Sequence, residues 1–237
     1  MKIALIGYGR MGKLVQARAR AQGHETGIVA TSHDAELTAA ELAARLRGYA
    51  VAVDFSVAEA VTRNVEACAL ARLPLVEGTT GWDAQLDQVR RTVEQHGSAL
   101  VYGANFSIGA NLFFRLVAHA ADLFAAFADY APFIEEAHHA RKRDAPSGTA
   151  LKLRELLARH WPVETISVAA TRAGHIPGTH RVGFDALDDQ ILLQHEARTR
   201  EGFAAGALLA AEWIAARRRG VYEFSALMDQ LISERRR

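Results

Sequence analysis

The chain has 237 residues, of which 50% are hydrophobic and 23% charged, and its 28 basic and 27 acidic side chains leave a net charge of +1. This composition excludes a disordered, collagen-like or low-complexity protein, and the length predicts one or two domains. The balanced charge provides no field of one sign for nucleic acid or a membrane surface, so neither partner is expected. With one cysteine, Cys68, no signal segment and no long apolar span, we expect a cytoplasmic protein.

The first hundred residues alternate short apolar runs with longer periodic segments. The runs predict strands over Lys2–Ile6, Gly27–Ala30, Ala50–Phe55, Leu75–Glu77 and Ala99–Tyr102. Helices are predicted over Gly12–Ala21, Ala35–Arg47, Ser56–Leu70 and Asp83–His96, the third starting from a capping box of Ser56 and Glu59. Alternation with short connections indicates an α/β domain with a doubly wound parallel sheet.

The pattern changes after Tyr102. Strands are predicted over Phe133–Ala137, Ser167–Thr171, Thr179–Phe184 and Gln190–Ala197, and helices over Asn111–Ala125, Ser147–His160, Phe203–Arg219 and Ser225–Arg235. This block indicates an α+β domain with an open, mixed, largely antiparallel sheet. We predict a dinucleotide-binding domain over 1–105, to which segment 208–237 returns, and a substrate-binding and oligomerisation domain over 106–207.

A glycine-rich turn follows the first strand. Its residues are Gly7, Tyr8, Gly9, Arg10, Met11 and Gly12. In such a turn the first glycine allows the tight bend, the second lets backbone approach a pyrophosphate, and the third lets the helix pack on the strand. The following helix end offers free N–H groups and a partial positive charge. The motif is weak alone, but its position before a series of βα units predicts Rossmann-type dinucleotide binding.

The end of the second strand carries no carboxylate of the kind that holds the ribose of NAD. Thr31 and Ser32 stand there, followed by His33, and Asp34 comes late. These hydroxyls and His33 can surround a 2′-phosphate, with Arg10 as the nearby cation. Equally, the segment can be a solvated loop that caps the next helix through Ser32 or Asp34.

Two further loops follow strands at the edge where doubly wound sheets bind ligands. In the first, Gly78, Thr79 and Thr80 can give hydroxyl and backbone groups to a nicotinamide, although Thr80 can also simply cap the next helix. The second loop contains Ala104, Asn105 and Phe106 and has the same two interpretations.

The densest cluster of polar residues spans 136–149, EAHHARKRDAPSGT. No metal site is predicted, because adjacent histidines on an extended chain point to opposite sides. The basic run can be a solvated loop. Alternatively, the helix that starts after Ser147 can bind an anion at its N-terminus, with Lys142 as a cation and a histidine as proton donor. The second interpretation describes a pocket for a small carboxylate.

The segment EAHHARKRDAPSGTA resembles the signature of the dihydrodipicolinate reductase family. Supporting segments lie in the family's order across essentially the whole chain. They are GYGRMG, VDFS, GTTG, ANFSIG, RAGHIPGTH, HEARTREGFAAGA and GVYEF. The resemblance implies reduction of 4-hydroxy-tetrahydrodipicolinate to tetrahydrodipicolinate by NADH or NADPH, in the diaminopimelate route to lysine. It also implies a homo-oligomer, with a tetramer favoured over a dimer.

The resemblance also implies roles for single residues. His138 matches the family's proton donor and Lys142 the lysine that assists it, while His139, Gly148 and Thr149 match substrate-binding positions. The cofactor would contact Gly7–Gly12, Gly78–Thr80 and Ala104–Phe106.

Three departures from the family pattern matter. The glycine turn is one residue tighter, Thr31 and Ser32 replace the usual charged residue, and the chain is shorter between Ala158 and Thr171. Cofactor preference and oligomer size are left open by these departures. Two other functions are weighed against the reductase: another two-domain NAD(P)-dependent amino-acid dehydrogenase, and a catalytically silent NADPH-sensing protein.

Overall fold

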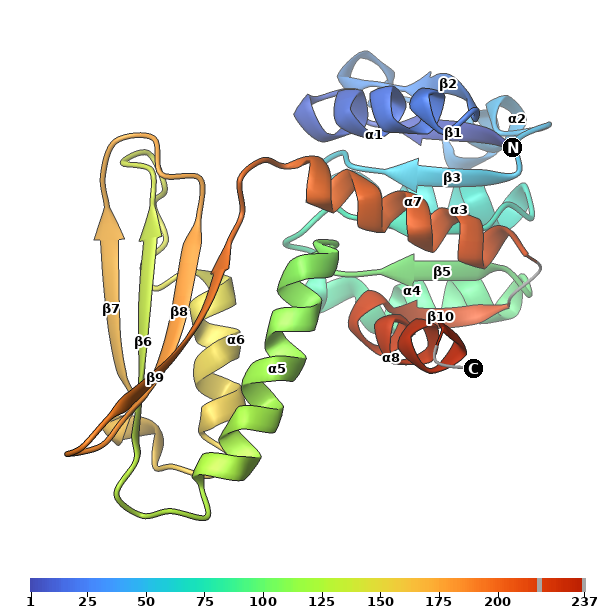
Figure 1. The fold of residues 1–237 in the computed structure, drawn as a ribbon. Helices are drawn as coiled ribbons and strands as arrows, with labels where there is room; N and C mark the ends of the chain where they lie inside the picture. Colours follow the sequence, from blue (N-terminus) through green and yellow to red (C-terminus); the bar gives the residue numbers. More distant parts are fainter. Residues whose placement is uncertain (217–218, 236–237) are drawn as a thin grey trace. The chain divides into compact units, whose positions relative to one another are not determined.

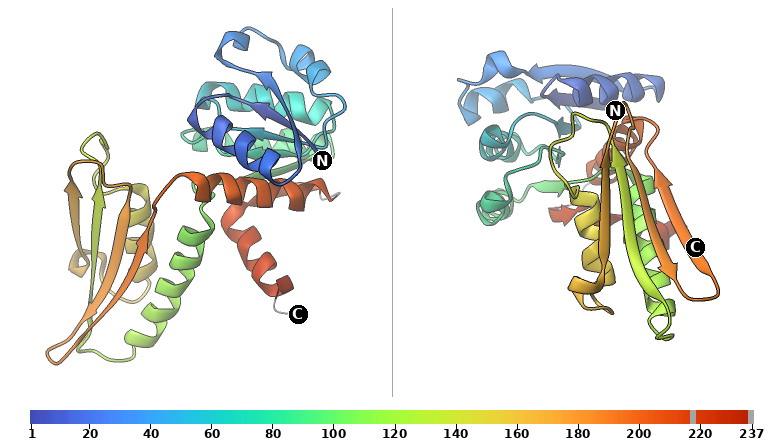
Figure 2. Two further views of the ribbon diagram at one scale, coloured as in Figure 1. Left: turned by 45° about the horizontal axis from the view of Figure 1, so that its top comes forward. Right: turned by 90° about the vertical axis from the view of Figure 1, so that its left-hand side faces the viewer.

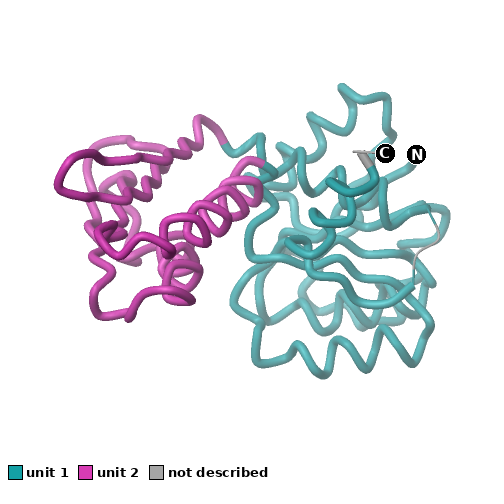
Figure 3. The backbone as a smooth tube through the Cα atoms, turned by 60° about the horizontal axis from the view of Figure 1, so that its bottom comes forward, with its two compact units in different colours: residues 1–108, 200–237 teal, residues 109–199 magenta. Residues whose placement is uncertain are grey.

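The computed structural model describes residues 1–216 and 219–235 and divides the chain into two compact units (Figure 3). Unit 1 comprises residues 1–108 and 200–237, and unit 2 comprises residues 109–199. Residues 200–207, assigned to the second domain from the sequence, therefore belong to unit 1. They open helix α7 (Glu201–Ala215), whose buried side chains form part of the core of unit 1. In the described part of the chain, no helix is long and apolar enough to cross a membrane.

Unit 1 is built on a six-stranded sheet in the order β10-β5-β4-β3-β1-β2, and every pairing is parallel (Figure 1). The strands are β1 (Lys2–Ile6), β2 (Glu25–Ala30), β3 (Val51–Asp54), β4 (Leu75–Glu77), β5 (Ala99–Tyr102) and β10 (Gly220–Glu223). The doubly wound parallel sheet predicted from the sequence is confirmed.

Helices cover both faces of this sheet. They are α1 (Arg10–Ala21), α2 (Ala39–Arg45), α3 (Val61–Leu70), α4 (Leu86–Gln95), α7 and α8 (Phe224–Arg235). Successive strand residues point to opposite faces, so Val53 and Val101 pack in one core with α1, α7 and α8. Ala52 and Leu100 pack in the other core, with α2, α3 and α4. Because both faces of the sheet are buried, the sequences of these strands are continuous apolar runs.

Several element boundaries in unit 1 differ from the sequence prediction. Strand β10 was not predicted, and β2 begins two residues early, at Glu25. The capping box of Ser56 and Glu59 is wrong: the N-cap of the 3₁₀ turn Ala58–Ala60 is Val57, without a side-chain bond. The Ser56 hydroxyl instead lies 3.2 Å from the Asn64 amide nitrogen, which donates to it. Helix α7 ends at Ala215, and the predicted helical residues 217–218 lie outside the described residues.

Unit 2 contains a four-stranded mixed sheet in the order β7-β6-β8-β9, as predicted. Its strands are β6 (Ala131–His138), β7 (Ser167–Arg172), β8 (Thr179–Asp185) and β9 (Gln190–Glu196). Strand β6 pairs parallel with β7 and antiparallel with β8, which pairs antiparallel with β9. Helices α5 (Ile108–Phe124) and α6 (Gly148–Leu157) lie beside this sheet (Figure 2). Val117 and Leu153 of these helices are buried in one core with Ile134 and Val182 of the sheet.

Candidate active site

The glycine turn Gly7–Gly12 joins β1 to α1 in unit 1. Gly7 has φ +80°, and a Cβ there would lie 2.3 Å from the carbonyl oxygen of Phe55. A Cβ on Gly12 would lie 2.3 Å from the carbonyl oxygen of Gly7, so the chain itself requires both glycines. Gly9 differs, because no atom lies within 4 Å of its Cβ position. The open space at Gly9 is the place where backbone can approach a ligand.

The start of α1 provides the charge that this turn needs. Gly9 is the N-cap, no side chain caps the helix, and its first turn contains no acidic residue. The first N–H groups and the positive end of the helix dipole are therefore available to a phosphate. Arg10 is exposed beside them, and the Tyr8 hydroxyl donates to Gln16. Met11 is half-buried against the core of unit 1. These residues fit the pyrophosphate of a dinucleotide.

A folded-back carboxylate occupies the end of β2. The Thr31 backbone N–H and hydroxyl donate to Oδ2 of Asp34 at 2.9 Å and 3.1 Å, and Arg45 pairs with Oδ1 at 2.7 Å. The hydrogen bonds from Thr31, with that from Arg45, lower the pKa of Asp34. Thr31 and Asp34 form a capping box on the 3₁₀ turn Ser32–Asp34. The N-cap of the next helix, α2, is Thr38, not Ser32 or Asp34 as the capping interpretation expected. Ser32 is exposed.

Thr79 holds together the loops that follow β3 and β4. Its N–H donates to Oε1 of Glu77 at 2.8 Å, and its hydroxyl accepts from the N–H of Ser56 at 3.0 Å. A Cβ on Gly78 would lie 2.1 Å from the Phe55 ring, so this loop packs tightly on its neighbour. Thr80 is exposed and caps no helix, since the next turn begins after Trp82 without a side-chain cap. Thr80 is thus available to a ligand.

The loop after β5 divides its residues between the surface and the core. Ala104 is exposed, and Oδ1 of Asn105 accepts from the N–H of Ser107 at 2.8 Å. The ring of Phe106 is only 2% exposed and packs on Phe55 and Phe224. The ring of Phe106 is therefore part of the core of unit 1 and is not available to a cofactor.

A buried carboxylate organises the polar cluster of unit 2. The Oε1 atom of Glu136 accepts from the Ser147 N–H at 3.0 Å and from Nη2 of Arg172 at 2.6 Å. Its Oε2 atom lies 3.5 Å from both Nδ1 of His138 and Nε2 of His180. Strand register produces this meeting, because Glu136 is paired with His180 on β8 while His138 is paired with Arg172 on β7. Glu136, His138 and His180 are at most 8% exposed.

Burial and charge set the protonation of these groups. Burial opposes ionisation of Glu136, but hydrogen bonds from Ser147 and Arg172 outweigh it and lower the pKa of this carboxyl. Burial lowers the pKa of His138, and the neighbouring Glu136 carboxylate offsets this only in part. Burial, with a contribution from His138, lowers the pKa of His180 to about 4. Both imidazoles are therefore neutral at pH 7, and only an added anionic group would favour the charged form of His138.

Helix α6 (Gly148–Leu157) begins one residue after and ends three residues before the predicted helix Ser147–His160, and Ser147 is its N-cap. The Ser147 hydroxyl accepts from the N–H of Ala150 at 3.2 Å and lies 3.2 Å from Nε2 of His180. Its first turn contains no acidic residue. Gly148 is exposed, and Thr149 is half-buried. The Glu136 carboxylate thus accepts from the Ser147 N–H at this helix end and also lies 3.5 Å from Nδ1 of His138.

Lys142 and His139 lie in the loop between β6 and α6. Lys142 is in an ion pair with Asp144 at 2.8 Å, and the hydrogen bond from Lys142 lowers the pKa of Asp144. A carboxylate ligand of Lys142 must therefore compete with Asp144. Nδ1 of His139 is buried without a hydrogen-bond partner, so this imidazole has an unused polar atom.

Sequence reasoning missed three residues of this site: Glu136 as its centre, and Arg172 and His180 as its partners. The alternation of Glu136 and His138 on one face of a strand was the available signal for the first. The other two come from strands whose register no local pattern reveals. Glu136, His138 and His180 present ligand atoms within 4.8 Å of one another. Because Arg172 already neutralises Glu136, we interpret this triad as an electrostatic cluster, in which Oε2 of Glu136 and Nδ1 of His138 are buried without a hydrogen-bond partner.

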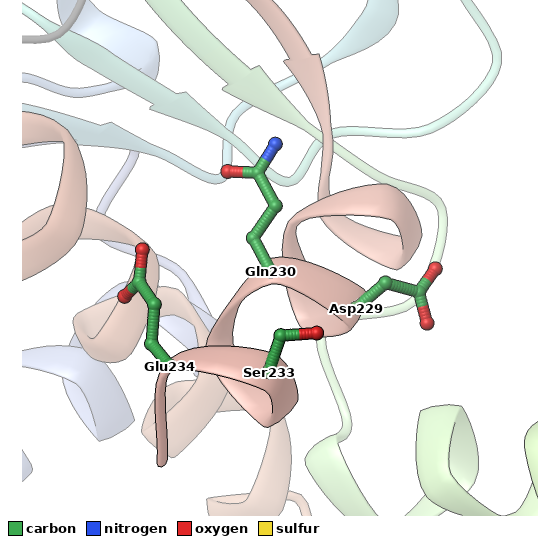
Figure 4. Close-up of a pocket in the computed structure, with 4 residues that line it drawn as sticks. All are labelled: Asp229, Gln230, Ser233 and Glu234. Carbon is green, nitrogen blue, oxygen red and sulfur yellow. The ribbon is translucent and has the colours of Figure 1, made fainter. Parts of the chain in front are cut away.

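A separate hollow lies along α8 and is lined by Asp229, Gln230, Ser233 and Glu234 (Figure 4). None of the residues predicted to bind cofactor or substrate lines it. The cofactor candidates lie in unit 1 and the substrate candidates in unit 2.

A doubly wound sheet with a glycine-rich turn after its first strand, and a second unit that holds a buried histidine near a helix N-terminus, are typical of a two-unit nicotinamide-dependent reductase. The chain belongs to the dihydrodipicolinate reductase family, whose N-terminal model matches residues 1–106 and whose C-terminal model matches residues 109–228. The family and the reductase activity expected from the sequence are confirmed.

Individual relatives agree with this assignment. The chain is 36% identical over 228 residues to 4-hydroxy-tetrahydrodipicolinate reductase of Christiangramia forsetii, covering 90% of this chain and 92% of the relative. Its fold is similar to that of dipicolinate-bound dihydrodipicolinate reductase from Paenisporosarcina sp. TG-14, with a TM-score of 0.76 and 21% identity. The match covers 97% of this chain and 98% of that relative. A probable dehydrogenase from Thermotoga maritima is more distant, with a TM-score of 0.57, 11% identity and coverage of 100% and 98%.

Proposed function

We propose that this chain reduces 4-hydroxy-tetrahydrodipicolinate to tetrahydrodipicolinate with NADH or NADPH, and that His138 delivers the proton. The observation that carries the proposal is the position of Glu136, whose carboxylate accepts from the Ser147 N–H at the start of α6 and lies 3.5 Å from Nδ1 of His138. This arrangement combines a proton donor with an anion site, and the substrate is a cyclic dicarboxylate that loses its hydroxyl group as water and gains one hydride and one proton. The relative solved with dipicolinate bound supports a ligand of this chemistry.

Separate groups of residues bind the cofactor, bind the substrate and transfer the proton in this proposal. Gly9 and the N–H groups at the start of α1 hold the pyrophosphate, while Thr80 and the backbone of Ala104–Phe106 face the nicotinamide half. The N–H groups of Gly148 and Thr149 bind one substrate carboxylate, with His139 and Lys142 as further donors. A bound nicotinamide supplies the hydride. Neutral His138 gains its proton when the dianionic substrate arrives, because a nearby negative charge favours the imidazolium.

Both cofactors are accepted in this proposal. Arg10 and the Ser32 hydroxyl suit a 2′-phosphate, whereas the Thr31 hydroxyl already donates to Asp34, whose carboxylate suits a ribose diol. Because Arg45 partly neutralises Asp34, repulsion of a 2′-phosphate is reduced.

The protein forms a homo-oligomer in this proposal, with a tetramer favoured over a dimer. The sheet of unit 2 buries one face under α5 and α6, while on the other face Leu192 is 45% exposed. The size of the oligomer is measured by light scattering as the protein elutes from a size-exclusion column. The cytoplasmic location remains a prediction from the single cysteine, Cys68, which is free and buried.

The decisive experiment is a coupled assay in which the substrate is generated enzymatically and oxidation of each cofactor is followed. Turnover with either cofactor is expected, and it should be abolished when the substrate-generating enzyme is omitted. Tight NADPH binding without any turnover would instead identify the silent sensing protein. Turnover of an amino acid but not of the cyclic imine would identify the alternative dehydrogenase.

A further inference from the structure

Two carboxyl groups meet inside unit 1 without a cation. Asp54 ends β3 and Glu77 ends β4, and the two residues are direct partners in the register of the sheet. Both are 0% exposed. Neither forms an ion pair with a Lys, Arg or His among the residues that the structure describes. Two ionised carboxylates in such a place would repel each other at low dielectric and lack solvation.

The hydrogen bonds of the pair leave one oxygen of each carboxyl for the other. Oδ2 of Asp54 accepts from Nδ2 of Asn64 at 2.7 Å, and Oε1 of Glu77 accepts from the Thr79 N–H at 2.8 Å. Oδ1 of Asp54 and Oε2 of Glu77 are buried and have no hydrogen-bond partner outside the pair. The hydroxyl and N–H of Ser56 also lie close enough to the Asp54 carboxyl to lower its pKa, but burial outweighs them. A single proton between these two oxygens satisfies both.

The surroundings decide how that proton is shared. Burial raises the pKa of Asp54, and burial together with the Asp54 charge raises that of Glu77 well above its usual range. Asp54 receives the Asn64 amide, whose own oxygen accepts from Arg63 at 2.9 Å, so negative charge is better stabilised on Asp54. The other titratable neighbours are Cys68 of α3, whose pKa is raised by burial and by this pair, and Tyr102, which is paired with Glu77 on β5.

The pair lies directly under the loops assigned to the nicotinamide. Gly78 follows Glu77 in the chain, and the Gly78 N–H donates to the carbonyl oxygen of Asp54 at 2.9 Å. Thr79 bridges from Glu77 to the N–H of Ser56. A nicotinamide ring is neutral when reduced and positively charged when oxidised, so a fixed negative charge nearby discriminates between the two forms.

We propose that Asp54 and Glu77 share one proton at neutral pH, and that their single remaining negative charge favours the oxidised over the reduced cofactor. Both residues are positioning residues that act through the loops above them. The part concerning the cofactor rests on the function proposed above, whereas the shared proton does not depend on it.

Infrared spectroscopy of the full chain without cofactor tests the shared proton. Glu77→Gln and Asp54→Asn each replace the proton by an amide N–H aimed at the remaining carboxylate, so each keeps one negative charge. The carbonyl stretch of a protonated carboxyl, identified by its shift in D2O, is expected in the wild type at pH 7 and in neither variant. Glu66→Gln, at an exposed position of α3, is the matched control and should retain the band. Absence of the band from the wild type, or its survival in both variants, would overturn the proposal.

Cofactor binding tests the remaining charge. The Kd of the oxidised and the reduced cofactor is measured for the wild type, both single variants and the double variant, with folding checked by circular dichroism. The ratio of the two Kd values should be unchanged in the single variants. In the double variant it should shift against the oxidised form by roughly 3- to 10-fold, as expected for loss of one charge. An unchanged ratio in a folded double variant would refute the role of the charge. A wild-type chain that binds neither cofactor would instead refute the proposed function.

Discussion

Arg172 donates to Oε1 of Glu136 across 2.6 Å from the neighbouring strand, and Glu136 is only 3% exposed. The guanidinium thus holds ionised a carboxylate that burial alone would favour in its neutral form. The same carboxylate faces His138 and His180 with its second oxygen. The protonation of the proposed proton donor therefore depends on an ion pair in which it takes no part.

Glu136→Gln should lower the pKa of His138 further, because the carboxylate that raises it is removed while Arg172 and Lys142 remain. We expect loss of kcat/KM at pH 7 and a destabilisation of about 1–3 kcal/mol from the unpaired Arg172. The histidine pKa is measured by NMR and the stability by urea unfolding. Glu135→Gln is the control, since its side chain lies on the opposite face of β6 and is 48% exposed. Equal histidine titration in the two variants would contradict this role of Glu136.

His138→Gln should lower kcat by about 10²- to 10⁴-fold, the usual cost of losing a general acid. The cofactor Kd should hardly change, because His138 and the cofactor candidates belong to different units. His119→Gln, at an exposed position of α5, serves as the control. An unchanged kcat in the purified variant would remove His138 from the mechanism.

The pH profile of the wild type provides a second test of His138. The protonated imidazole is the active form, and burial lowers its pKa in the free enzyme below the ordinary 6.5. We therefore expect kcat/KM to fall as pH rises through that lowered pKa, and kcat to fall only at higher pH, since bound substrate favours the imidazolium. If kcat/KM and kcat fall over the same pH range, bound substrate does not favour protonation of His138.

His180 should make the fold sensitive to acid. Its pKa is about 4 in the folded chain and 6.5 when exposed, so the unfolded state binds the extra proton between these values. Stability is therefore fully present above pH 6.5 and is lost as pH falls toward 4, by at most about 3 kcal/mol. The free energy of unfolding is measured across this range for the wild type and for His180→Gln. In His180→Gln the free energy of unfolding should depend less steeply on pH. Part of the dependence should remain, because burial also lowers the pKa of His138 and of His195.

Lys142→Ala should raise KM if Lys142 binds a substrate carboxylate, and added salt should raise KM more in the wild type than in this variant. The structure adds a complementary variant: Asp144→Asn releases Lys142 from its ion pair and should lower KM. Lys152→Ala, which removes an exposed lysine of α6, is the control. If added salt raises KM equally in the wild type and in Lys142→Ala, Lys142 binds no substrate carboxylate and is part of a solvated loop.

Thr31→Glu should lower kcat/KM for NADPH while leaving NADH use unchanged or improved. A carboxylate there would repel a 2′-phosphate, and one charged contact at about 4 Å is worth around 1–4 kcal/mol. Arg10→Ala should weaken NADPH selectively as well. The measurement is kcat/KM for both cofactors at fixed ionic strength. If Thr31→Glu changes kcat/KM equally for the two cofactors, the residues at the end of β2 do not distinguish a 2′-phosphate from a 2′-hydroxyl group.

The sequence predicted what local patterns encode and missed what distant strands bring together. The strand from Lys2 to Ile6 and the helix after Ser147 were found because apolar periodicity and a capping residue mark them. Strand β10 was missed because its sequence, GVYE, is not a continuous apolar run and its partner, β5, lies far back in the chain. Arg172 and His180 escaped for the same reason, since only the pairing of β6 with β7 and β8 places them at Glu136.

Unit 2 is an insertion in the sequence of unit 1, and this arrangement fixes the order in which a growing chain can fold. Every strand of the mixed sheet has been synthesised by Glu196, before α7 and β10 exist. Until α7 emerges, Val53 and Val101 on one face of the parallel sheet lack the helix that buries them. The nascent N-terminal half therefore carries an open apolar surface throughout synthesis of the insertion, and a chain that stops before Arg200 keeps that surface permanently.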